Sequence, residues 1–349
     1  MKATRREFGT MPDGRKVYAF TLENDNGMSC DVVEFGAILR TLNVPGRDKT
    51  YDVVLGQDDL DGVVNRGTYN AIIVGRHANR IAYGKFTIDG VEYQMETREG
   101  RTVCHSGRGN YGRRLFVGDC NATDERAMAV LHLHENGEGG LPGEADATVR
   151  YILTNDNALT VEYAISCTAP TPINPTNHAF FNMSGHECTS IDDLEVWFDS
   201  DFYLPVDPTE LPTGEVFKVD GTPFDFRTPT KMGGYLAQVQ DVEQLRLCRG
   251  YDHNMCINGR GFHKAASCYS EKSGVNMEVW TDLPGIHFYT ANWPAKCVGK
   301  GGVDYQVQGS LCFETQFYPN ASGYSQFPSN IFYPGETMRS KTSFKFNVK

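Results

Sequence analysis

Five short segments of the sequence place ionisable or amide side chains among turn-forming or aromatic residues, where proton transfer or ligand binding can occur. Carboxylates and imidazoles are the side chains that most often transfer protons in enzymes. These segments therefore hold the candidate chemistry of the chain. They are ANRIAYGKF with Asn79 and Arg80, CHSGRGNYG with His105, NPTNHAFFN with His178, GYDHN with Asp252, and FETQFYP with Glu314.

The carboxylate of Glu314 lies in the segment LCFETQFYP, where the flanking Leu311, Cys312 and Phe313 are expected to be buried. A carboxylate in such a strand needs either a charged partner or a chemical task. An ion pair with an arginine is one explanation, and a role in proton transfer is the other.

The other candidate side chains have structural explanations of their own. His178 precedes a pair of phenylalanines and could be a hydrogen-bonded core histidine. Asp252 could cap a turn, Arg80 could form a structural salt bridge, and Asn79 could hold a turn through its own backbone. Each residue type alone leaves both interpretations open.

The elements that must position these side chains are predicted to be strands. Runs such as VYAFTL, AVLHLH, ATVRYIL and MEVWTDL alternate in hydrophobicity, and PDGRK, TNDNAL and YPNASG are typical of turns. The strongest helical period, from about Tyr235 to Arg246, is short and ends before Gly250. No linker or charge block divides the chain, so we predict a single all-β domain over residues 1–349.

Composition excludes several classes of partner. A formal net charge of -11 leaves no basic surface for nucleic acid. The N-terminal MKATRREFGTMPDGRK has no apolar stretch of the kind a signal peptide needs, and no later segment approaches a membrane span. We therefore expect a cytoplasmic protein without a membrane partner. The ten cysteines never form a C-x-x-C pair, and most are expected to be buried and reduced.

Several local motifs lack the context that would give them a function. Gly107, Gly109 and Gly112 match G-x-G-x-x-G, but no βαβ unit surrounds them, so a turn is predicted. The stretch GEGGLPG lacks the lysine and hydroxyl of a phosphate-binding loop. His132 and His134 share a face of a predicted strand without a third ligand, so no metal site is expected there.

Taken together and in this order, the five segments resemble those of the aldose 1-epimerase (galactose mutarotase) family, whose usual runs are similar to GR-x-ANRI, LHGG, TNH-x-FN, YDHN and LETQ. The resemblance extends from about Gly36 to Phe346 and includes GAILRTLNVP, DFYLPVDPTELPTGEV and PGETMRSKTSFKF. It implies a β-supersandwich fold with an open sugar-binding cleft.

The resemblance also implies a role for each candidate residue in exchanging the α and β anomers of a free aldohexose of the glucose or galactose type. Glu314 is the expected general base and His178 the expected general acid, and no metal or other cofactor is expected. The remaining residues are expected to orient the sugar, and they are Asn79, Arg80, His105, Asp252 and His287.

Some positions depart from the family's usual pattern. His287, in PGIHFYT, stands where the family usually has glutamine, and CHSG replaces LHGG around His105. Leu194 stands in DDLEV where a histidine is usual. These changes leave the acid and the base in place but leave the preferred sugar open.

Three other functions remain compatible with the sequence. A sugar-phosphate 1-epimerase would need cations near the cleft, where Arg80, Arg108, Arg113 and Arg114 are candidates. A non-catalytic carbohydrate-binding protein would keep the cleft without the chemistry. A glycosidase would use Glu314 and Asp252 as paired carboxylates. We expect a monomer or a weak homodimer in every case.

Overall fold

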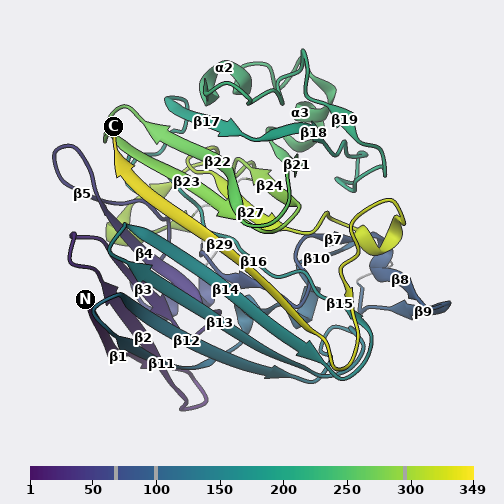
Figure 1. Ribbon diagram of the computed structural model, residues 1–349, viewed down its shortest axis with the longest axis horizontal. Coiled ribbons are helices and arrows are strands. Elements are labelled where there is room, and N and C mark those ends of the chain that lie inside the picture. Colours follow the sequence, from purple (N-terminus) through teal and green to yellow (C-terminus); the bar gives the residue numbers. More distant parts are fainter. Residues whose placement is uncertain (67–69, 98–100, 294–296) are drawn as a thin grey trace.

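The computed structural model describes residues 1–66, 70–97, 101–293 and 297–349. Antiparallel sheets make up most of the structure, and helices are few and short (Figure 1). The prediction of an all-β fold is therefore confirmed. In the described part of the chain, no helix has both the length and the apolarity that a membrane crossing requires.

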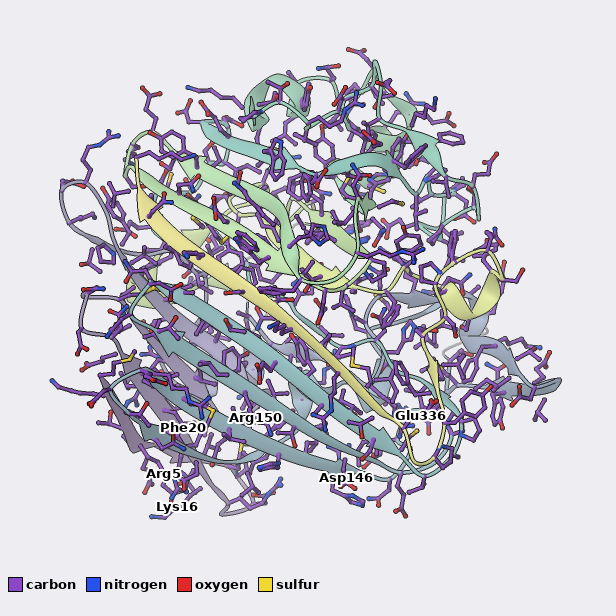
Figure 2. All side chains as sticks on the ribbon, viewed as in Figure 1. Arg5, Lys16, Phe20, Asp146, Arg150 and Glu336 are labelled. Atoms are coloured by element: carbon purple, nitrogen blue, oxygen red, sulfur yellow. The ribbon has the colours of Figure 1, made fainter. Side chains whose placement is uncertain are left out.

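The largest sheet has nine strands, and the long strand β29 crosses its middle (Figure 1). Its strands alternate as the sequence predicts: on β13, Val149 and Tyr151 are buried, whereas Asp146 and Arg150 face outward (Figure 2). In spatial order the strands are β11 (Val117–Ala122), β12 (Arg126–Glu135), β13 (Ala145–Thr154), β14 (Ala158–Cys167), β29 (Thr337–Val348), β23 (Val275–Thr281), β22 (His263–Ser270), β17 (Leu194–Phe198) and β20 (Thr230–Lys231).

The N-terminal strands form a second, five-stranded sheet. Phe20 on β2 is fully buried, and Arg5 and Lys16 extend toward solvent (Figure 2). One large hydrophobic cluster joins Phe20 to Phe344 of the nine-stranded sheet, so the two sheets share a core. The strands are β1 (Lys2–Thr10), β2 (Lys16–Glu23), β3 (Ser29–Val33), β4 (Ile38–Pro45) and β5 (Thr50–Asp52).

A third sheet of five strands supplies three residues of the candidate site, which are Asp252, His287 and Glu314. Every residue of β21 and β27 is buried, because both faces of these strands are covered. On one face Phe288 and Phe313 pack against Phe198, with ring centroids 5.1 and 5.7 Å from it. The spatial order is β19 (Phe217–Lys218), β18 (Ser200–Tyr203), β21 (Asp252–Ile257), β24 (Gly285–Tyr289) and β27 (Cys312–Gln316).

The stretch from Tyr235 to Arg246, where the sequence has its strongest helical period, contains the end of one short helix, a turn and the start of a second short helix. The predicted end before Gly250 is confirmed, because Arg249 takes a left-handed conformation. The helices are α1 (Leu60–Asn65), α2 (Met232–Leu236) and α3 (Glu243–Cys248).

Short two-stranded ladders connect the large sheets. Two of them, β7 with β10 and β6 with β16, bring parts of the candidate site together. Their bounds and those of the other short strands are β6 (Ile73–Val74), β7 (Arg80–Ile81), β8 (Lys85–Ile88), β9 (Val91–Gln94), β10 (Val103–Cys104), β15 (Thr171–Pro172), β16 (Thr176–Asn177), β25 (Cys297–Val298), β26 (Asp304–Tyr305) and β28 (Ile331–Phe332).

The motifs without functional context lie in turns and on an exposed strand face. The G-x-G-x-x-G stretch forms two short 3-10 turns, η2 (Gly107–Gly109) and η3 (Tyr111–Arg113). His132 and His134 are exposed on β12, where they contact Thr148 and Asp146 of the neighbouring strand. All ten cysteines are unpaired, and most are buried.

Candidate active site

Strand alternation gives the third sheet one polar face. In β27 the side chain of Glu314 points away from the aromatic core, because Phe313 on one side of it points toward that core. His287 on β24 is directly opposite Glu314, and Asn254 on β21 is directly opposite His287. Three neighbouring strands thus present polar side chains to the same side.

Two short ladders form the facing wall. His178 follows β16, and its backbone N–H donates to the carbonyl of Ile72 at 2.9 Å. Asn79 and His105 flank the β7–β10 ladder, and both have left-handed backbones, with φ of 62° and 52°. The N–H of His105 donates to the Asn79 carbonyl at 3.0 Å, and the N–H of Asn79 donates to His105 Nδ1 at 3.1 Å. This reciprocal pair stabilises a conformation that costs energy for a residue other than glycine.

The two walls enclose a cavity of about 280 Å³. All seven residues predicted from the sequence line it, although they come from six separate segments of the chain. They are Asn79, Arg80, His105, His178, Asp252, His287 and Glu314.

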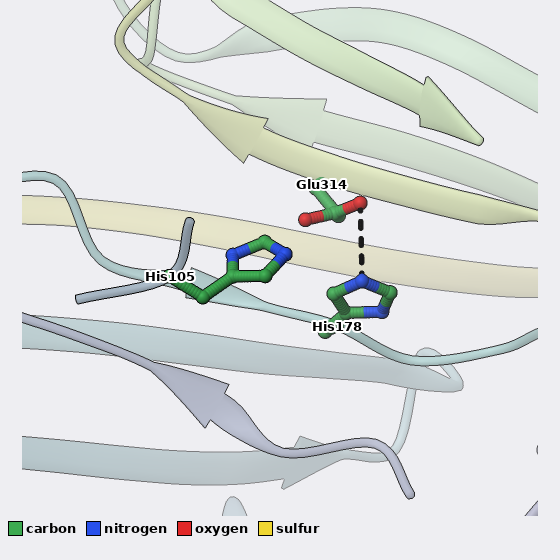
Figure 3. A group of neighbouring side chains, drawn as sticks. All are labelled: His105, His178 and Glu314. Atoms are coloured by element: carbon green, nitrogen blue, oxygen red, sulfur yellow. Dashed lines mark ion pairs between the residues drawn. The ribbon is translucent and has the colours of Figure 1, made fainter. Parts of the chain in front are cut away.

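Glu314 and His178 face each other across this cavity (Figure 3). The distance from His178 Nε2 to Glu314 Oε1 is 3.5 Å, and the side chains are 13% and 1% exposed. Burial raises the pKa of Glu314 well above its usual value and lowers the pKa of His178 to about 3. Among the described residues, Glu314 has no arginine or lysine partner, and its Oε2 accepts no hydrogen bond. The explanation of Glu314 as one half of a core ion pair with an arginine is therefore wrong.

Arg80 is the centre of a separate charged network. Its guanidinium donates to Asp252 at 3.0 Å and also to Glu210. The Nε2 of His287 lies 2.5 Å from the other oxygen of Asp252. Burial opposes ionisation of Asp252, but Arg80 and His287 hold its pKa well below the usual value. Asp252 is thus an ionised acceptor held in place by two donors, not a turn cap.

The side chain of Asn79 contributes to the same region. Its Oδ1 accepts hydrogen bonds from the backbone N–H of Arg80 at 2.9 Å and from Nη1 at 3.3 Å. Asn79 thus holds the local backbone and Arg80 forms salt bridges, as their structural interpretations predicted. Both side chains also line the cavity.

His105, His178 and Glu314 each offer one possible metal-ligating atom, and these atoms lie within 4.8 Å of one another (Figure 3). A metal-bound histidine normally donates its second N–H to an acceptor. In His105 the second nitrogen, Nδ1, accepts from the N–H of Asn79, so the neutral ring carries its proton on Nε2, toward the site. Burial lowers the pKa of His105 to about 4, which keeps that ring neutral. The group is thus arranged to donate hydrogen bonds and fits a metal ion poorly.

Several residues of the site were not predicted individually. Phe180, Tyr289 and Trp293 line the cavity, as does Cys104. Strand alternation could have identified Tyr289, because it follows His287 by two residues and lies on the same face of the strand. Glu210 lies in a turn, and its sequence neighbourhood gave no signal for a contact with Arg80.

The fold and the site together define an all-β protein with a buried carboxylate beside an imidazole in a small polar cavity. A model described as aldose 1-epimerase matches residues 18–345. The chain is 36% identical to the galactose mutarotase of Homo sapiens, over 99% of this chain and 98% of that protein. It is 29% identical to the aldose 1-epimerase of Escherichia coli (strain K12), over 96% of each chain.

Solved structures agree with these matches. The galactose 1-epimerase from Lactobacillus acidophilus NCFM superposes with a TM-score of 0.87 at 26% identity, covering 99% of each chain. A GalM/aldose epimerase homologue from C. elegans gives 0.85 at 28% identity, over 94% of this chain and 98% of that one. The chain therefore belongs to the aldose 1-epimerase family, as the five segments predicted. It is an isomerase of the class that interconverts aldose anomers.

Proposed function

We propose that the chain interconverts the α and β anomers of a free aldohexose of the glucose or galactose type, with Glu314 as general base and His178 as general acid. One observation carries these roles. Within the described ranges, a buried carboxylate without an arginine or lysine partner lies 3.5 Å from an imidazole in the wall of a cavity. Such an arrangement is costly for stability and is typical of a proton-transfer site.

The reaction needs two proton transfers at neighbouring atoms of the sugar. Glu314 takes the proton of the anomeric hydroxyl while protonated His178 gives one to the ring oxygen, and the bond between the anomeric carbon and the ring oxygen breaks. The product is an open-chain aldehyde. Rotation about the adjacent carbon–carbon bond presents the other face, and the same transfers in reverse close the ring.

The acid and the base together must carry one proton. His178 with a proton and Glu314 without one holds the same number of protons as neutral His178 with protonated Glu314. Because burial lowers the pKa of His178 to about 3 and raises the pKa of Glu314, the pair keeps that single proton over a wide range of pH. The short distance between the two groups lets the proton reside on either.

The remaining polar residues are proposed to orient the sugar hydroxyls. Asp252 is an ionised acceptor, and Arg80 and the Nε2 of His105 offer donors from the facing wall. The amide of Asn79 and the imidazole of His287 complete the polar lining. Aromatic rings then flank the sugar, and they belong to Phe180, Tyr289 and Trp293.

The site favours a free sugar over a sugar phosphate. Arg80 already pairs with Asp252 and Glu210, so the cation that lines the cavity is neutralised. Arg114 pairs with Glu138 at 2.8 Å, and Arg108 is 80% exposed in a neighbouring depression. The cavity of about 280 Å³ is also slightly smaller than the usual range of small-ligand pockets, roughly 300–1,000 Å³.

The glycosidase alternative is disfavoured by the same contacts. A glycosidase would need Asp252 and Glu314 to work as a pair on opposite sides of a glycosidic bond. Asp252 is instead held by Arg80 and His287, and the group facing Glu314 is His178.

Polarimetry on freshly dissolved α-glucose and α-galactose tests the proposal directly. We expect the purified protein to accelerate the approach to anomeric equilibrium, and to act more slowly on glucose 6-phosphate than on glucose. Binding of the sugar by calorimetry without faster exchange would instead show a carbohydrate-binding protein. Release of nitrophenol from aryl glycosides would show a glycosidase.

A further inference from the structure

The buried thiol of Cys312 has no part in the mechanism described so far. Its Sγ lies 3.6 Å from Nδ1 of His178, on the side of the ring away from Glu314. Cys312 is completely buried, and burial raises the pKa of its thiol well above the usual value, so the sulfur stays protonated and uncharged.

One strand contacts both nitrogens of the same imidazole. Cys312 and Glu314 are two residues apart on β27 and therefore share its polar face. Glu314 approaches Nε2 of His178, and Cys312 approaches Nδ1. Cys312 is the side chain that contacts Nδ1 among the described residues, and the backbone of His178 itself lies beside the ring.

The proton on Nδ1 decides which nitrogen does the chemistry. The nitrogen that donates to the ring oxygen must be Nε2, because Nε2 points toward the proposed base Glu314 (Figure 3) and both residues line the cavity. When Nε2 has lost its proton, the neutral ring must carry the remaining proton on Nδ1. The tautomer with the proton on Nε2 could not take the proton back from the sugar.

We infer that Cys312 is a positioning residue for the proposed acid, in that its sulfur accepts a hydrogen bond from Nδ1–H of His178 and fixes Nε2 as the nitrogen that gives and takes the proton. This inference rests on the proposed role of His178.

A thiol suits this task better than a carboxylate would. A carboxylate at Nδ1 stabilises the charged imidazolium and makes it a weaker acid. Sulfur is a weak acceptor, so it orients the ring without holding the proton on it. Phe180 supports the same orientation, with ring centroids 4.7 Å apart and planes tilted by 32°.

The test measures the tautomer of His178 by long-range ¹H–¹⁵N NMR on the uniformly labelled protein near neutral pH, with the His178 signals assigned by comparison with His178→Asn. The variants are Cys312→Ala, which removes the acceptor, and Cys312→Ser, which replaces it. Cys268→Ala is the matched control, because Cys268 is equally buried and lies on β22 among the core residues.

The expected result is that Nδ1 carries the proton in the wild-type protein and in Cys312→Ser, and that Cys312→Ala shows a mixture of tautomers. The kcat of Cys312→Ala should fall on the order of fivefold to tenfold, as for loss of one hydrogen bond, with KM unchanged. Cys312→Ser should restore most of it, and Cys268→Ala should match the wild type.

Two results would overturn the inference. One is a wild-type His178 with its proton on Nε2. The other is a Cys312→Ala protein with an unchanged tautomer. Because the spectrum needs no activity, this failure is distinct from failure of the proposed function, which full activity of His178→Asn would show.

Discussion

His287 donates a hydrogen bond to Asp252, with 2.5 Å between its Nε2 and the Oδ1 of the carboxylate. The opposite nitrogen of the ring, Nδ1, is buried and has no hydrogen-bond partner among the described residues. Burial lowers the pKa of His287, so this ring is neutral at neutral pH and Nδ1 is a bare acceptor. A glutamine, which the family usually has here, can also donate to Asp252 but presents a different second group.

Changing His287 to glutamine should alter which sugar is preferred while leaving exchange active. The amide keeps a donor for Asp252, and the acid and base are untouched. Since one hydrogen bond to a sugar hydroxyl changes discrimination by roughly threefold to tenfold, ratios of kcat/KM across a panel of aldoses should shift by that amount. Identical ratios for variant and wild type would show that His287 does not contact the sugar.

Removal of either proton-transfer group should nearly abolish exchange. Glu314→Gln and His178→Asn keep the shape of the cavity but cannot transfer the proton, so kcat should fall on the order of 10²–10⁴-fold. Polarimetry on α-galactose measures the loss. His132→Asn is the matched control, because His132 is an exposed histidine on β12 away from the cavity, and it should retain full rate. Wild-type rates in either active-site variant would refute the assigned roles.

The sequence predicted much of the site because its residues occur in short segments with recognisable order. Strand alternation also placed side chains correctly, since Glu314 on β27 has its carboxylate on the face opposite Phe313. Alternation along a strand does not predict which other strand lies beside it in the sheet. The pairing of His287 with Glu314 depends on the register of β24 against β27, which is a contact between distant segments.

Contacts made by turns were beyond prediction for a related reason. Glu210 contacts Arg80 although 130 residues separate them, and nothing in its segment DFYLPVDPTELPTGEV indicates which residue it would contact. Likewise, the choice between an ion pair and a catalytic role for Glu314 depended on where the arginines lie. The structure removes the ion-pair explanation among the described residues, because Arg80 pairs with Asp252 and Glu210 instead, and the catalytic role of Glu314 stays a proposal.

Glu314→Gln should also make the protein more stable. The wild-type carboxylate is 1% exposed and its Oε2 has no hydrogen-bond partner in the part of the chain that the structure describes, so its ionised form is unfavourable in the folded state. A group whose pKa is raised by folding gives stability at low pH that is lost as the pH rises through the folded pKa. The variant lacks this loss, so its gain in the free energy of unfolding should grow with pH, to about 1 kcal/mol or more above neutrality.

Urea unfolding of both proteins at several pH values measures this difference. If Glu314→Gln is more stable than the wild type, increasingly so at higher pH, and yet inactive, its loss of activity is due to the missing carboxylate and not to misfolding. A variant less stable than the wild type at every pH would contradict the account of Glu314 as a strained group.

Chelation of metal ions should leave the activity unchanged. His105 donates from Nε2 because Asn79 occupies Nδ1 as a donor, so this ring offers the site a proton and not a lone pair. Dialysis against EDTA, followed by polarimetry, should give the rate of the untreated protein, and added Zn²⁺ should not raise it. A rate that falls on chelation and returns with metal would require a different role for His105, His178 and Glu314.

The dependence of kcat/KM on pH should reflect a pair that needs one proton. With usual pKa values, a histidine and a glutamate hold one proton together only between about pH 4 and 6.5. Here burial lowers the pKa of His178 to about 3 and raises the pKa of Glu314, so the pH range in which the pair holds one proton widens in both directions.

Activity should therefore persist below pH 4.5, fall only as a second proton binds near pH 3, and decline at high pH as the last proton leaves. The neighbouring Asp252 and Arg80 stay charged across this range, because the pKa of the carboxyl is held low and that of the guanidinium high. The profile, corrected for spontaneous exchange, would contradict this pairing if kcat/KM fell with an acid limb near pH 6.5.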